Sequence, residues 1–294
     1  MNWVTLKYKA ECTWKEYLFQ KRRKNLKQEI IRYYTGNHSD NEEILSAVAY
    51  LQKHPLNTFP APFAEKYKEE DIMVEKDSGN GLLYIVQEGK RLYFKRSYNA
   101  ITIKKLYSGL KMEQDMESPH CYMTSKFAIE AGDTFFDIGC AEGNMALTYI
   151  EKVDHLVLFE RDKEWLEALQ ATFAPWKDKV TIVDRYVSDV DDKINVSIDN
   201  FLKTYPHQPN FIKVDVEGAE ERVLIGMKEL LFQPGLKIAL CTYHRQDDYE
   251  YFIKRFAPTK AQIMPSKGVM LFLNDIKQMK PPYFRKGLIR ITTP

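Results

Sequence analysis

The stretch "FIKVDVEGAE", residues 211–220, has the period-2 pattern of a strand, with apolar residues alternating with Lys213, Asp215 and Glu217. A glycine and an apolar-periodic helix follow it, as in an α/β unit, where a central strand is normally apolar on both faces. The charge therefore needs an explanation. We expect both carboxylates at the carboxyl end of the strand, where open α/β sheets bind ligands. Lys213 is then the expected charge partner of Asp215 or Glu217, because an unpaired buried ammonium is costly.

The residues around this stretch alternate between strand-like and helix-like segments. This rhythm is typical of βαβ units and predicts a doubly wound, mostly parallel α/β sheet. The expected strands are residues 134–139, 155–160, 180–185, 210–215, 237–243 and 268–273, and the expected helices are residues 142–152, 163–174, 221–231 and 249–256. The chain is then expected to close on a proline-marked tail, residues 281–294.

The first part of the chain lacks this rhythm. Apolar residues from Trp14 to Tyr34 fall near helical spacing, and Ser39 with Glu42 forms a capping box before a second helix. Residues 82–98 predict a hairpin that turns at 88–90. We therefore divide the chain into a helical and hairpin appendage, residues 1–117, and a ligand-binding domain, residues 118–294.

Composition limits the partners of the chain. A formal net charge of +2 over 294 residues gives no argument for nucleic acid, and no stretch approaches the roughly 18 apolar residues of a membrane span. The four cysteines are far apart and form no C-x-x-C pair, which predicts reduced thiols. The amino terminus lacks the apolar core of a signal peptide. We expect a cytoplasmic protein.

A nucleotide-like ligand site is predicted at "FDIGCAEGN", residues 136–144. Gly139 and Gly143 allow a tight turn from strand to helix, and Glu160 ends the next strand, where a carboxylate binds the hydroxyls of a ribose. The spacing is not the G-x-G-x-x-G of dinucleotide enzymes. Asp137 and Glu142 would repel a pyrophosphate but suit ammonium and sulfonium charges. We therefore expect S-adenosylmethionine rather than NAD, bound by these five residues and by Asn144 at the helix start.

These motifs together resemble the FkbM-type methyltransferases, class I enzymes that usually methylate hydroxyl groups of sugars, polyketides and related metabolites. "K-x-D-x-E-G-A-E" is the most specific stretch of that family, and residues 213–220 match it without a break. The resemblance covers residues 118–273. "SPHCY" (118–122) and "CTYHRQDD" (241–248) also resemble a bacterial subgroup linked to surface-polysaccharide gene clusters.

The resemblance implies a seven-stranded, Rossmann-like sheet with one antiparallel edge strand. It also implies that Asp137, Gly139 and Gly143 contact the methyl donor and that Glu160 binds its ribose. Cys140 stands where many relatives have alanine, and the first 110 or so residues have no counterpart in the shared pattern. The acceptor is therefore left open within the class of sugars, polysaccharide precursors and glycosylated metabolites.

Methyl transfer to oxygen requires an aligned acceptor and a group that removes its proton. Asp215, Glu217 and His244 are the candidate catalytic residues, because the strands that carry them should end at one edge of the sheet. We predict His244 as the base and Asp215 as its helper. Tyr243, Arg245 and His120 are the candidate substrate contacts. A divalent metal held by Asp215 and its neighbours is left open, because some class I O-methyltransferases chelate their acceptor. The sequence shows no further ligands at fixed spacing, so no metal is assigned.

Two other functions stay open on the sequence: an NAD-dependent oxidoreductase, and a non-catalytic binding or scaffold protein that retains the fold. The appendage is predicted to cover the acceptor site, to mediate homo-oligomer formation, or to dock a pathway partner.

Overall fold

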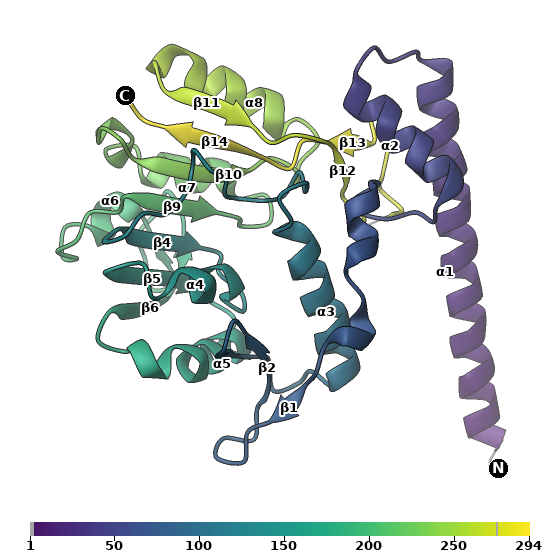
Figure 1. The fold of residues 1–294 in the computed structure, drawn as a ribbon, viewed down its shortest axis with the longest axis horizontal. Coiled ribbons are helices and arrows are strands. Elements are labelled where there is room, and N and C mark those ends of the chain that lie inside the picture. The colour runs from purple at the N-terminus through teal and green to yellow at the C-terminus, as the bar shows by residue number, and fades with distance from the viewer. Residues whose placement is uncertain (1–2, 275) are drawn as a thin grey trace.

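The computed structural model describes residues 3–274 and 276–294. Its main element is a seven-stranded sheet, whose strands Figure 1 shows one above another at the left, with α3 between the sheet and the long helix α1. In spatial order the strands are β11 (Gln262–Pro265), β14 (Leu288–Thr292), β10 (Lys237–Cys241), β9 (Phe211–Val214), β4 (Thr134–Ile138), β5 (His155–Glu160) and β6 (Val180–Asp184).

The α/β prediction is confirmed for the five central strands, which run parallel from β10 to β6. Two details are wrong. The antiparallel strand β14 is not at the edge but pairs on both sides, with β10 and with β11. Residues 268–273 do not add a strand to this sheet, because β12 (Met270–Leu271) pairs with β13 (Phe284–Arg285) in a separate two-stranded sheet.

Helices cover both faces of the sheet because successive strand residues point to opposite sides. Phe135 and Phe211 pack with α3, α4 and α5, whereas Phe136 and Ile212 pack with α6, α7 and α8. The α-helices are α1 (Trp3–Gly36), α2 (Glu42–Lys53), α3 (Ala100–Glu113), α4 (Asn144–Tyr149), α5 (Lys163–Phe173), α6 (Ile198–Phe201), α7 (Glu220–Gly226) and α8 (Asp248–Phe256).

The shorter elements lie in the connections. The remaining strands are β1 (Glu75–Lys76), β2 (Leu83–Gln87), β3 (Lys90–Tyr93), β7 (Tyr186–Val187) and β8 (Asn195–Val196), and the 3-10 helices are η1 (Pro62–Lys66), η2 (Glu69–Asp71), η3 (Ala174–Trp176), η4 (Leu230–Phe232) and η5 (Ala257–Thr259). The predicted hairpin is present as β2 and β3. The predicted capping box is not the cap of α2, because the Asn41 side chain accepts the amides of Glu43 and Ile44.

The amino-terminal elements pack in two places. Helices α1 and α2 share a hydrophobic cluster with β12 and β13, and Figure 1 shows them beside each other, away from the main sheet. The hairpin and α3 instead belong to the hydrophobic cluster on the α4–α5 side of the main sheet. The second part of the appendage is thus positioned to form a wall of any site on that side. The boundary at residue 117 stays a prediction.

None of the helices in the described part of the chain is both long enough and apolar enough to cross a membrane.

Candidate active site

The candidate site forms where β4, β9 and β10 end side by side. Because these strands are parallel, their carboxyl ends meet at one edge of the sheet. Gly139 follows β4, Asp215 follows β9, and Tyr243 and His244 follow β10 closely. The predicted convergence of Asp215 with His244 is therefore present.

Lys213 has a different charge partner from the predicted one. It lies directly opposite Asp137 in the β4–β9 register, and its Nζ is 2.9 Å from Asp137 Oδ1. The same ammonium donates to the Gly139 carbonyl oxygen at 2.7 Å. Both side chains are buried, at 7% and 1% exposure. The lysine in the central strand thus balances a carboxylate of the neighbouring strand and holds the turn after β4.

Gly139 is required by this turn for two reasons. Its φ is +76°, and a Cβ placed on it would lie 2.0 Å from the carbonyl oxygen of Asp215. We expect Gly139→Ala to lower the free energy of unfolding by about 2–5 kcal/mol, from the left-handed conformation plus the forced displacement of backbone.

Gly89→Ala is the matched control for urea denaturation. Gly89 has a φ of +79° but nothing within 4 Å of its Cβ position. It should therefore lose only about 1–2 kcal/mol, the conformational part of the effect. Equal losses in the two variants would contradict a close-packed turn.

Asp215 is the centre of the site. The hydroxyls of Tyr122 and Tyr243 donate to its two carboxylate oxygens at 2.7 and 3.2 Å. His120 Nε2 and His244 Nε2 face the same oxygens at 3.7 and 3.4 Å. Burial raises the pKa of Asp215, but the charge of Lys213 and the surrounding donors outweigh burial and set this pKa at about 2. Asp215 is therefore a firmly ionised carboxylate, and hence a weak base.

His244 lies between two carboxylates. Its Nδ1 is 2.8 Å from Glu220 Oε1, its Nε2 faces Asp215, and its side chain is 4% exposed. Burial lowers the pKa of His244, but the hydrogen bond to Glu220 and the charge of Asp215 more than compensate, so this pKa lies above its ordinary value. If the ring were neutral, one of its two nitrogens would turn a lone pair toward a carboxylate oxygen, which is unfavourable. The predicted base role therefore requires His244 first to release a proton that this setting retains.

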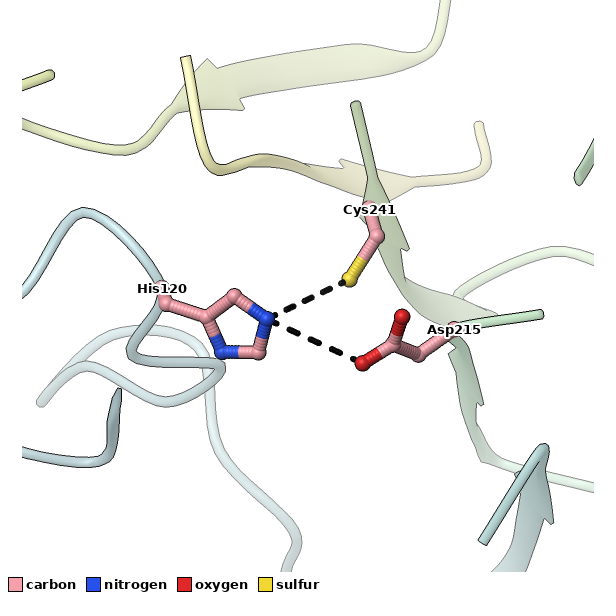
Figure 2. A group of neighbouring side chains, drawn as sticks. All are labelled: His120, Asp215 and Cys241. Atoms are coloured by element: carbon pink, nitrogen blue, oxygen red, sulfur yellow. Dashed lines mark hydrogen bonds and ion pairs between the residues drawn. The ribbon is translucent and has the colours of Figure 1, made fainter. Parts of the chain in front are cut away.

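A second group of side chains lies behind Asp215. Figure 2 shows the His120 ring pointing its Nε2 toward both Asp215 and Cys241, with His120 Nε2 3.9 Å from Cys241 Sγ. These three donor atoms lie within 4.8 Å of one another, whereas ligands of one zinc ion lie roughly 3.3–3.7 Å apart. We assign no metal to this group.

Two cavities meet at Asp215. One, of about 560 Å³, is lined by Glu160, Arg185 and Ser188, and the other, of about 410 Å³, by Glu142, Tyr243 and His244. Gly139, Ala141, Asp215 and Glu217 line both cavities. The Glu160 carboxylate also accepts the backbone amides of Ala141, Arg161 and Asp162, which fixes its position at the end of β5. The arrangement offers two adjoining chambers joined at an ionised carboxylate.

Several predicted site residues have other positions or contacts. Asp137 is buried under the turn with Lys213, and a Cβ on Gly143 would lie 2.9 Å from both Leu169 and Phe173, which indicates close packing there.

Glu217 is exposed at the cavity rim, while Arg245 is exposed and lines neither cavity. Asn144 lines the second cavity. His120 is buried behind the cavity wall, 1% exposed.

Three residues of the site were not assigned roles from the sequence. Tyr122 belongs to the quoted "SPHCY" string, and Glu220, the first residue of α7, accepts the amides of Val216 and Gly218 besides contacting His244. Glu113, the last residue of α3, lines the second cavity. Nothing in the local sequence pattern distinguishes Glu113, because it lies in α3, before the alternating strands and helices that form the main sheet.

The sheet order, the glycine turn after β4 and the acid that ends β5 define a class I, Rossmann-like methyltransferase fold. Residues 143–269 match the model of the methyltransferase FkbM domain, so this part of the chain is an FkbM-type methyltransferase domain. The predicted family is thereby confirmed. Glu113, His120, Asp137 and Gly139 lie before the matched range.

Solved structures with a similar arrangement are distant in sequence. The methyltransferase FkbM from Methylobacillus flagellatus KT is 17% identical with a TM-score of 0.45, over 67% of this chain and 56% of that chain. The precorrin-6y C5,15-methyltransferase from Geobacter metallireducens GS-15 is 13% identical with a TM-score of 0.40, over 58% and 83%. Aeropyrum pernix fibrillarin, in complex with natively bound S-adenosyl-L-methionine, is 14% identical with a TM-score of 0.39, over 76% and 99%.

The chain thus spans little more than half the length of the Methylobacillus protein. No curated protein matches the chain.

Proposed function

We propose that the chain is an S-adenosylmethionine-dependent O-methyltransferase that acts on a hydroxyl of a sugar, a polysaccharide precursor or a glycosylated metabolite. The observation that carries this proposal is the pair of cavities that meet at Asp215. A two-substrate transfer needs two adjoining chambers with the reacting atoms at their junction. The FkbM-type methyltransferase domain identifies the transferred group as methyl.

The cavity at Glu160 fits the nucleoside part of the donor. A carboxylate at the end of the second strand is placed to accept hydrogen bonds from ribose hydroxyls. The donor supplies a methyl group on a positively charged sulfur, and its amino acid part carries an ammonium. Asp215, Glu217 and Glu142 line the neighbouring chamber with carboxylates, which suits these positive charges and disfavours a pyrophosphate. NAD therefore fits less well.

The second cavity fits a neutral acceptor. Tyr122, Tyr243 and Phe272 line it with aromatic surface, and Asp215 lies at its inner end to accept a hydrogen bond from a hydroxyl of the acceptor next to the reacting one. Its carboxylates disfavour an acidic sugar, and the exposed Arg245 is not there to offset them. The acceptor chemistry that this supports is an uncharged sugar or a similar polyhydroxy compound.

The appendage contributes to this cavity, with Thr58, Leu106, Leu110, Glu113 and Gln114 among the lining residues. This supports its role as a cover over the acceptor, within the proposed division at residue 117. A cytoplasmic site of action agrees with the free thiols of Cys121, Cys140 and Cys241, while Cys12 lies outside the residues with described side chains. That the protein takes part in polysaccharide biosynthesis and that it forms homo-oligomers are proposals that rest on the sequence alone.

Donor binding is tested by replacing the ribose acid. Glu160→Gln should weaken binding of S-adenosylhomocysteine by about 10- to 100-fold, because one amide cannot replace a charged acceptor of two hydroxyl hydrogen bonds. Isothermal titration calorimetry measures this. Glu229→Gln, an exposed acid that lines neither cavity, is the control and should bind as the wild type does.

The rival functions give different results in the same titration. An oxidoreductase would bind NAD and reject S-adenosylhomocysteine, which would exclude the methyltransferase proposal. A non-catalytic scaffold would bind the donor and yet transfer no methyl group to any acceptor fraction.

A further inference from the structure

Glu113 is an acidic group of the acceptor cavity to which the proposed function assigns no role. It is the last residue of α3, and it lines the cavity together with Asp215, Tyr243 and His244. Its side chain is 35% exposed, and its nearest ionisable neighbour is His120, with Nδ1 4.0 Å from Glu113 Oε2. Within the described ranges, 3–274 and 276–294, no hydrogen bond to its carboxylate is present. It is a carboxyl group without a fixed hydrogen-bond partner at the wall of the acceptor cavity.

The neighbouring groups are poor destinations for a proton. Asp215 accepts hydrogen bonds from two tyrosine hydroxyls and faces two histidines, and it stays ionised. His244 is held between Glu220 and Asp215, which outweigh burial and raise the pKa of its ring above the ordinary value, so the protonated form is favoured. Burial lowers the pKa of His120 to about 4, so the neutral ring gains a proton only with difficulty. Its Nδ1 is a buried nitrogen without a hydrogen-bond partner, on the side of Glu113.

We propose that Glu113 is the proton acceptor of the methyl transfer, and that His120 is the positioning residue that faces it. The inference rests on the proposed function. As the acceptor oxygen forms its bond to the methyl carbon, the carbon–sulfur bond breaks and its electron pair stays on sulfur. The hydroxyl proton passes to the Glu113 carboxylate, and the products are a neutral methyl ether and a neutral thioether. Asp215 orients the acceptor before the transfer by accepting a hydrogen bond from a neighbouring hydroxyl, so the proton of the reacting hydroxyl is free to pass to Glu113, which releases it to solvent afterwards.

The charges around Glu113 set the pH dependence of this step. Lys213 faces it from β9 and Asp215 from the turn after β9. Glu142 faces it from the turn before α4, and His120 from the loop between α3 and β4. Although 35% of the side chain as a whole is exposed, its carboxyl group is closely surrounded by the protein, and this burial, then repulsion by Asp215 and Glu142, raises the pKa of Glu113 to about 8, against the opposing charge of Lys213. A base acts only when ionised. The rate of methyl transfer should therefore rise with pH through about 8 and level off above it.

The decisive comparison is Glu113→Gln against His244→Gln, with methyl-labelled S-adenosylmethionine and a cell glycan fraction that the wild type labels. We expect Glu113→Gln to lower kcat by about 10²–10³-fold and to remove the rise with pH. Its affinity for S-adenosylhomocysteine should stay within about 3-fold of the wild-type value, which corresponds to a difference in binding free energy of less than about 1 kcal/mol. Glu113→Asp should restore part of the rate with the pH rise. His244→Gln should keep the wild-type pH profile, and His120→Gln should shift its midpoint.

A second measurement needs no acceptor. Carbon-13 NMR of side-chain carboxyl groups in the full chain should show one signal that titrates near pH 8 and is missing in Glu113→Gln. A Glu113 signal that titrates near its ordinary pKa would overturn the proposal.

Two kinetic results would also overturn it. One is a Glu113→Gln enzyme with wild-type kcat and pH profile. The other is weakened donor binding with an unchanged profile, which would make Glu113 a donor-binding residue. Failure of the wild type to bind S-adenosylhomocysteine would instead remove the proposed function itself, and this proposal with it.

Discussion

Asp215→Asn should lower methyl transfer by about 10³-fold, because it removes the charge around which the reaction chamber is built. The Asp215 carboxylate accepts two tyrosine hydroxyls and lies at the junction of the two cavities. Asparagine keeps the shape but has only one acceptor oxygen and no charge. It therefore neither orients the acceptor hydroxyl equally well nor balances the positive charge of the donor.

The two donor forms separate these effects. S-adenosylhomocysteine has no sulfonium, so its affinity for Asp215→Asn should stay close to that of the wild type, while S-adenosylmethionine should bind less tightly. Glu229→Gln is the control, since Glu229 is an exposed acid that lines neither cavity. It should keep a rate within about 3-fold of the wild type, as expected of a solvated charge. A rate for Asp215→Asn above a tenth of the wild type would remove Asp215 from the reaction.

Lys213→Met should produce the largest loss of stability, about 3–5 kcal/mol in the free energy of unfolding. The substitution removes the ammonium that lies 2.9 Å from Asp137 Oδ1 and leaves a carboxylate that is 1% exposed without its counter-charge. It also leaves the Gly139 carbonyl oxygen without its donor. Urea denaturation followed by circular dichroism measures the loss.

Two further variants test the cause. The double variant Asp137→Asn with Lys213→Met removes both charges and should recover a large part of the loss. Lys237→Met breaks an ion pair with Glu130, whose side chain is 71% exposed, and should change the free energy of unfolding by no more than about 1 kcal/mol. Equal losses for Lys213→Met and Lys237→Met would show that the buried ion pair contributes no more to the free energy of unfolding than the exposed one.

The central sheet was predictable because its strands carry continuous or alternating apolar runs between helices of regular period. The carboxyl-terminal strands were not. Residues 268–273 are as apolar as a core strand, yet β12 packs outside the main sheet, with Leu271 against α1 and α2 and Met270 against Phe59 and Phe63. The two strands that complete the sheet beyond β10 are β14 and β11, and neither was among the predicted strands. β14 lies in the tail after two prolines and contains Arg290, which is buried where it donates to the backbone of Tyr122 and Cys121.

The candidate site was predictable only as far as strand order determines it. Asp215 and His244 follow neighbouring parallel strands, so their proximity follows from topology. The partner of Lys213 depends on the β4–β9 register, which places it opposite Asp137 and not beside Asp215. Tyr122 and Glu113 come from segments before β4, and no periodicity in the sequence relates them to the strand ends.

The measurement that tests the central claim most directly is transfer of labelled methyl from S-adenosylmethionine to fractionated cell polysaccharide and metabolite pools, with the labelled product identified by mass spectrometry. The account predicts a methyl ether on a hydroxyl of an uncharged sugar residue, formed by the wild type and not by Asp215→Asn. Label on nitrogen or carbon, or equal labelling by the two proteins, would contradict it.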